Sequence, residues 1–176
     1  FIGAHSWAQN ILPVYQERAD EEADLIRGIH GFEAVHGRAP KGFISPRGTA
    51  STNTVELLVK NGFQWHSDHF DRDIPYLIDN EFGHLVAVPF SMEVNDMPLY
   101  IRYGNEPEAF TRVLERILDG FEDTFTPRAI LDLTTHAHVF GRPFGAIELR
   151  KSIEAVQKRD NVWLTTHEEL SETVSR

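Results

Sequence analysis

The chain has 176 residues, of which 41% are hydrophobic and 25% charged, as expected for one globular domain spanning 1–176. Its formal net charge is -10 and it has no basic cluster with interleaved aromatic residues, which argues against nucleic acid as a partner. Cysteine is absent, which excludes disulfides, thiol nucleophiles and cysteine-ligated zinc. No apolar run is long enough to span a membrane and no signal peptide is visible, so we expect a cytoplasmic protein without a membrane partner.

Short apolar runs alternate with stretches of helical spacing, the pattern of α/β units around a largely parallel sheet. In the first half this pattern predicts strands over 1–4, 42–44 and 63–66, a helix ended by Gly37, and a helix capped by Ser51 or Thr52 and stopped at Asn61. The stretch HSDHFDRDIPY that follows is rich in turn formers and predicts an irregular loop.

The second half of the chain continues the same alternation. It predicts strands over 85–88, 129–133 and 162–164, an amphipathic helix over 110–121, a helix around 147–156 and a last helix from Thr166. The stretch SMEVNDMPLYIRYGN between the first of these strands and the amphipathic helix predicts a long loop. About six β/α units result, fewer than in a full eight-fold barrel.

Polar residues follow the ends of five predicted strands, in chain order His5, then Arg47, then Asp68, Asp71 and Asp73, then Asn95 and Asp96, then His136 and His138. The carboxyl ends of parallel strands meet on one rim, so the pattern predicts one enzyme site. Each group also has a structural reading: a core histidine at His5, a turn arginine at Arg47, and Asx turns for the aspartates.

Four segments, AHSWAQN, FISPRG, FQWHSDHFDRDIPY and LTTH, resemble motifs of the polysaccharide deacetylase superfamily with the NodB-homology fold. The resemblance runs from Phe1 to about Leu170. It implies a distorted (β/α) barrel and the hydrolysis of a carbon–nitrogen bond. The family's first motif, an Asp-Asp pair after the opening strand, has no counterpart here, so we expect an α/β barrel that lacks its opening β/α segment.

The matched motifs imply roles for individual residues. His5 stands where the family keeps its first histidine ligand, but Gln9 replaces the second, and an amide is a poor substitute for imidazole on zinc. The resemblance therefore implies either no cofactor or a single divalent, zinc-type metal held by His5. His136 stands at the family's catalytic histidine, and Arg47 is displaced from the family's arginine position, where Ile44 stands.

Three longer stretches, SDHFDRDIPY, VPFSMEVNDM and HAHVFGRP, resemble the allantoinase-like and peptidoglycan-deacetylase-like branch. This likeness, together with Gln9, implies a hydrolase that opens a cyclic ureide or imide. His136 and His5 are then the catalytic residues. The residues expected to bind a small-molecule or sugar substrate are Arg47, Asp68, Asp73, Asn95, Asp96, His138 and Arg142.

Two other functions remain open from the sequence. A metal-dependent N-deacetylase of amino sugars or peptidoglycan would use His5 to hold an ion. A catalytically inactive member that binds carbohydrate would account for Gln9 and the displaced Arg47. A barrel without its opening segment would also expose a strand edge near Phe1, which favours a homo-oligomer.

Overall fold

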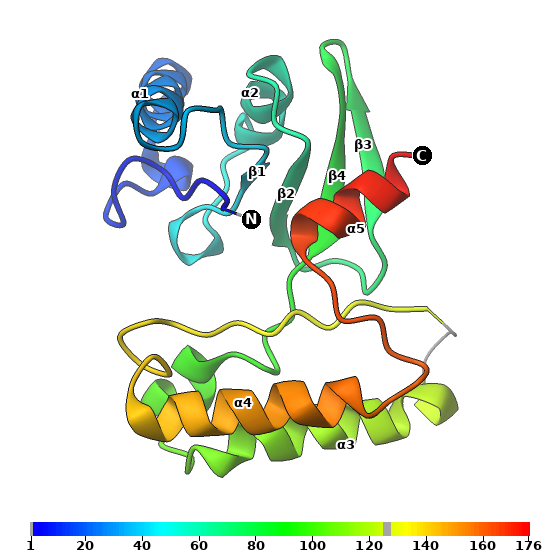
Figure 1. Cartoon of the computed structure of the whole chain (residues 1–176). Coiled ribbons are helices and arrows are strands. Elements are labelled where there is room, and N and C mark those ends of the chain that lie inside the picture. Colours follow the sequence, from blue (N-terminus) through cyan, green and yellow to red (C-terminus); the bar gives the residue numbers. More distant parts are fainter. Residues whose placement is uncertain (1, 125–127) are drawn as a thin grey trace. The chain divides into compact units, whose positions relative to one another are not determined.

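The computed structural model describes residues 2–124 and 128–176, and the side chains of 2–121 and 128–176. The chain forms two compact units (Figure 1). Unit 1 comprises Phe1–Pro89 and Thr165–Arg176, and unit 2 comprises Phe90–Leu164. The predicted single domain combines both units and stays a prediction.

Unit 1 begins with a short 3-10 turn, η1 (Pro13–Tyr15), and the long helix α1 (Arg18–His36). Gly37 ends α1 as predicted, because it adopts the left-handed conformation with φ 70° and its N–H bonds the carbonyl of Glu33. The second helix, α2 (Thr54–Lys60), starts after Asn53, so the predicted caps Ser51 and Thr52 are wrong. Ser51 instead accepts a hydrogen bond from the N–H of Asn53 in the turn before the helix.

The sheet of unit 1 has the order β1-β2-β4-β3 among the described residues. Its strands are β1 (Gly42–Phe43), β2 (Trp65–His69), β3 (Tyr76–Asn80) and β4 (Gly83–Pro89). β1, β2 and β4 run parallel, and β3 pairs antiparallel with β4 through a tight hairpin. The irregular loop predicted for HSDHFDRDIPY is wrong at both ends. At its start, β2 continues to His69, and at its end, Tyr76 begins β3, which forms five backbone pairs with β4.

The first predicted strand is reduced to a single parallel bridge between Ala4 and Phe43, and Phe1 lies outside the described residues. The core of unit 1 lies between the sheet and the helices α1 and α2, with Leu57, Leu58 and Leu85 fully buried. The chain returns to this unit in α5 (His167–Val174), which Thr166 and Glu169 open with a capping box. α5 lies against β2 and β4 (Figure 1).

Unit 2 is built on two packed helices, α3 (Glu108–Thr124) and α4 (Pro143–Gln157), both near their predicted positions. The predicted loop before α3 contains a π-helical segment, η3 (Met97–Arg102), that begins after Asp96. The strands predicted over 129–133 and 162–164 are absent. The first leaves one bridge between Asn95 and Thr134, and in the second Trp163 and Leu164 are exposed, so neither has the neighbours that a strand requires.

The α/β class is therefore confirmed, while the described residues form an open four-stranded sheet rather than a barrel. No helix in the described part of the chain is both long and apolar enough to cross a membrane.

Candidate active site

In unit 2, a buried carboxylate holds a partly exposed imidazole. Oδ1 of Asp96 lies 2.5 Å from Nδ1 of His136, and Oδ2 accepts the N–H groups of His136 at 2.7 Å and Phe140 at 3.2 Å. The side chain of Asp96 is 0% exposed and that of His136 is 35% exposed. Asp96 is therefore fully occupied in orienting His136, whose other ring nitrogen, Nε2, is left for a proton transfer.

The backbone brings the two residues together. The N–H of Thr134 donates to the carbonyl of Val94 at 3.0 Å, and the N–H of Asp96 donates to the carbonyl of Thr134 at 3.2 Å. These two bonds align residues 94–96 with 134–136, as in a short piece of parallel sheet. Asp132, whose place the sequence leaves open, accepts the Thr134 hydroxyl at 2.7 Å and supports the same segment.

A tight turn after His136 fixes the other side of the pair. The N–H groups of Val139 and Gly141 both donate to the carbonyl of His136, at 2.9 and 3.2 Å. A Cβ on Gly141 would lie 2.1 Å from the carbonyl oxygen of Ala137, so the turn has no space for a side chain there. Phe140 is thereby held with its N–H on Asp96.

The other residues predicted in unit 2 lie around this pair. His138 is exposed, and its ring centroid is 5.6 Å from that of His136. Asn95 is 7% exposed, and its side-chain oxygen accepts the N–H of Met97 at 3.0 Å. Arg142 is exposed at the start of α4. Their predicted contacts with substrate stay predictions, as does that of Asp96.

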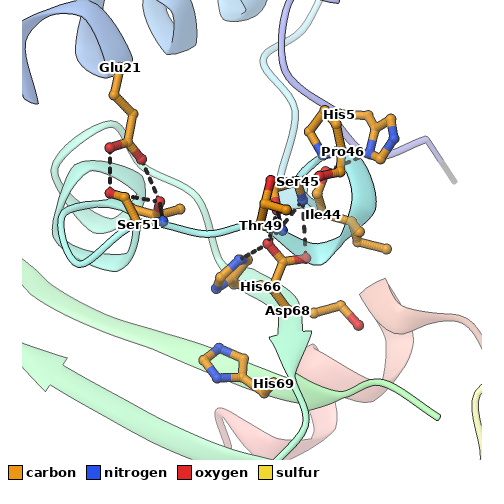
Figure 2. Close-up of polar contacts among 12 residues, drawn as sticks. His5, Glu21, Ile44, Ser45, Pro46, Thr49, Ser51, His66, Asp68 and His69 are labelled. Carbon is orange, nitrogen blue, oxygen red and sulfur yellow. Dashed lines mark hydrogen bonds and ion pairs between the residues drawn. The ribbon is translucent and has the colours of Figure 1, made fainter. Parts of the chain in front are cut away.

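In unit 1, His5 and Asp68 contact neighbouring residues of one segment (Figure 2). Nδ1 of His5 lies 2.6 Å from the carbonyl oxygen of Ile44, and because a carbonyl only accepts hydrogen bonds, Nδ1 carries the proton of this contact. Asp68 lies inside β2, and both of its oxygens are 3.1 Å from the N–H of Ser45. The hydroxyl of Ser45 also donates to Asp68.

The Asp68 carboxylate is buried, with 1% of its side chain exposed, and Nε2 of His66 lies 3.0 Å from its Oδ2 without hydrogen-bond geometry. Its position indicates an anchor for the segment after β1 rather than a group open to a ligand. His66 and Ser45 are not among the residues predicted from the sequence. The i, i+2 spacing of His66 and Asp68 in one strand was a usable signal, because such residues share a face of the sheet.

Burial lowers the pKa of His69 to about 4, and the nearby His66 contributes in the same direction. The hydroxyl of Tyr76 lies 3.3 Å from Nδ1 of His69 and donates to Asp71 at 3.0 Å. Burial, followed by the Asp71 carboxylate, raises the pKa of Tyr76. The predicted residue Asp73 is exposed in the connection to β3.

The remaining predicted residues of unit 1 lie on its surface. Arg47 is exposed in the 3-10 turn η2 (Pro46–Gly48), where its φ is 62°, and Gln9 is exposed in a turn before η1. No group of three or more histidine or acidic side chains suited to a metal occurs in the described part of the chain. The predicted role of His5 as a metal ligand stays a prediction. The predicted common rim combines residues of both units and stays a prediction.

No model of a protein family matches the chain. A peptidoglycan deacetylase of Helicobacter pylori is 25% identical over 95% of the chain and 68% of its own length. A Mycobacterium smegmatis structure described as a polysaccharide deacetylase has a TM-score of 0.87 at 28% identity, and covers 99% of the chain. The allantoinase PuuE has a TM-score of 0.84 at 23% identity over 97% of the chain, which shows a shared fold. The chain spans 62% and 57% of these two solved structures.

Proposed function

We propose that the chain belongs to the polysaccharide deacetylase family and that the protein hydrolyses a non-peptide amide bond, which its likeness to proteins described as deacetylases supports. The pairing of buried Asp96 with partly exposed His136 carries this proposal. A carboxylate on Nδ1 fixes the imidazole so that Nε2 can accept and return a proton. The preferred substrate class is a cyclic ureide or imide.

In the proposed reaction, Nε2 of His136 takes a proton from the attacking water as the oxygen bonds the amide carbonyl carbon. The carbon–nitrogen bond then breaks, and the same proton passes from Nε2 to the leaving nitrogen. The atoms of water are thus divided between the new carboxyl group and the released nitrogen. Asp96 stabilises the imidazolium that forms between the two steps, because its carboxylate faces the Nδ1–H group.

The remaining predicted residues have proposed roles at the substrate. Arg47 would orient a carbonyl through its planar donor groups, and His5 would orient water or substrate through Nε2. His138, Asn95 and Arg142 would contact the substrate around His136. The open sheet would belong to a distorted barrel, which the high TM-scores to longer structures support.

A metal-dependent N-deacetylase is the second candidate, favoured by the Helicobacter pylori relative described as a peptidoglycan deacetylase. The test is a hydrolysis screen of cyclic ureides, cyclic imides and N-acetyl sugars, with and without chelator. Ureide or imide opening that resists chelation supports the first candidate, whereas chelator-sensitive release of acetate from a sugar supports the second.

The variant His136→Ala distinguishes the two candidate hydrolases from an inactive, carbohydrate-binding protein. We expect kcat to fall by about 10²–10⁴-fold when the acid/base is removed. The variant His84→Ala is the matched control, because it deletes an exposed imidazole at the start of β4 that has no proposed contact with substrate. Equal rates for the wild-type protein and His136→Ala would eliminate the proposed mechanism.

A further inference from the structure

We propose that Trp7 is a positioning residue, which docks on α1 and thereby fixes the orientation of His5. The docking surface is a stripe of α1 residues, Asp24, Arg27, Gly28 and Gly31, here called the α1 stripe. This inference relies on the proposed function only for the role of His5 in orienting water or substrate. The contacts between Trp7 and α1 lie within unit 1 and do not depend on that role.

Two side chains of the α1 stripe contact Trp7 directly. The backbone N–H of Trp7 donates to Oδ2 of Asp24 at 3.3 Å. The guanidinium carbon of Arg27 lies 4.1 Å from the centroid of the indole ring, a cation–π contact. Backbone and ring of Trp7 are thus held by residues one helical turn apart, on the same face of α1.

Gly31 of the α1 stripe makes room for the Trp7 ring. A Cβ on Gly31 would lie 2.8 Å from Cζ3 of the Trp7 ring, closer than side chains normally approach. A Cβ on Gly28 would be 4.0 Å from both the Ser6 carbonyl carbon and the Trp7 nitrogen, which is an ordinary van der Waals contact. Glycine weakens a helix interior, and its occurrence at position 31 has a reason in the close approach of the Trp7 ring.

On the other side, the chain is anchored to β1. The N–H of Ala4 donates to the carbonyl of Gly42 at 2.8 Å, and the N–H of Ile44 donates to the carbonyl of Ala4 at 3.1 Å. His5 then donates from Nδ1 to the carbonyl of Ile44 at 2.6 Å.

Ser6 connects the two anchors with a φ of 54°, a left-handed conformation that is unfavourable for a residue with a side chain. Such a conformation persists when the surroundings hold the chain on both sides. Release of Trp7 from the α1 stripe would free Ser6 to relax, and His5 would then lose its hydrogen bond to Ile44. Without the hydrogen bond to Ile44, the proton of the His5 ring would no longer be held on Nδ1, and Nε2 would no longer be fixed as the hydrogen-bond acceptor of the ring.

The test reads the tautomer of His5 by long-range ¹H–¹⁵N spectra of the ring nitrogens at pH 8. The His5 signals are assigned by their loss in His5→Gln. In the wild-type protein we expect the Nδ1–H form. We expect Trp7→Ala and Gly31→Ala to lose this form and show the mixed tautomers of a solvent-exposed histidine.

Three comparisons separate positioning from general damage to the fold. Trp7→Phe keeps an aromatic ring on Arg27 and should retain the Nδ1–H form. His30→Ala removes an exposed side chain of α1 outside the stripe and should leave His5 unchanged. The ring signals of His136, in unit 2, serve as an internal reference that should not move in any variant.

Retention of the Nδ1–H form in both Trp7→Ala and Gly31→Ala would overturn the inference. If Trp7→Ala fails to fold, Gly31→Ala and the milder Arg27→Gln replace it. Loss of the Nδ1–H form of His5 in these two variants supports the inference, and its retention overturns it. The spectra require no turnover. If the proposed function alone is wrong, the protein will show no hydrolysis, but the tautomer of His5 will still depend on Trp7.

Discussion

Asp96 and His136 are 40 positions apart in the sequence, yet Oδ1 of the first lies 2.5 Å from Nδ1 of the second. The carboxylate is fully buried and also accepts two backbone N–H groups, from His136 and Phe140. A buried carboxylate with three donors holds its partner in one orientation, because any rotation would leave a charge unpaired.

Asp96→Asn should lower kcat by about 10²–10⁴-fold, because an amide does not stabilise the imidazolium of His136. Stability should fall by about 1–3 kcal/mol, since the amide replaces one acceptor oxygen with a donor facing N–H groups. Steady-state rates and urea unfolding followed by circular dichroism measure the two effects. Asp119→Asn, at an exposed ion pair with Arg159, should alter stability by less than about 1 kcal/mol and leave kcat unchanged.

Gly141→Ala should destabilise the protein by about 1–3 kcal/mol and lower kcat, because the new Cβ would meet the Ala137 carbonyl and displace the turn that supports Asp96. Gly37→Ala is the comparison: its φ of 70° costs about 1–2 kcal/mol, but a Cβ there meets nothing within 4 Å. Both variants should melt earlier, and only Gly141→Ala should lose activity. A normal kcat in Gly141→Ala would contradict the role of the turn.

Asp68→Asn should cost about 1–3 kcal/mol of stability, because it weakens a buried acceptor of the Ser45 N–H and hydroxyl groups. Asp73→Asn, at an exposed position five residues on, should stay within about 0.5 kcal/mol of the wild-type protein. The midpoints of urea unfolding of the two variants measure this difference in stability. Equal midpoints would mean that the Asp68 contacts contribute nothing to folding.

Stability should fall as the pH is lowered from about 6.5 to about 4, because His69 has a pKa of about 4 in the folded protein and an ordinary value near 6.5 when unfolded. In this range the unfolded chain binds a proton that the folded chain does not, so the free energy of unfolding rises with pH. His69→Gln should flatten this part of the profile measured by urea unfolding. His84→Gln, exposed at the start of β4, should retain the slope, and an unaltered slope in His69→Gln would refute the assignment.

The helices were largely predictable from the sequence, because their signals are local. Gly37 ends α1, apolar spacing marks α3, and Thr166 with Glu169 opens α5. The strand β3 was missed, because pairing with β4 forms it despite polar and turn-forming neighbours. The strands expected over 129–133 and 162–164 failed for the opposite reason, since apolar runs without strand neighbours form no ladder.

The sequence by itself therefore determined where most helices lie and which side chains are candidates for chemistry, since residue type and short-range spacing are written in it. It named Asp96, His136 and His5 without their partners. Only the tertiary structure decided that Asp96 is buried under His136, that Asp68 holds Ser45, and that Trp7 docks on α1. Burial and hydrogen-bond partners arise between segments distant in the chain, and no local pattern specifies which of them meet.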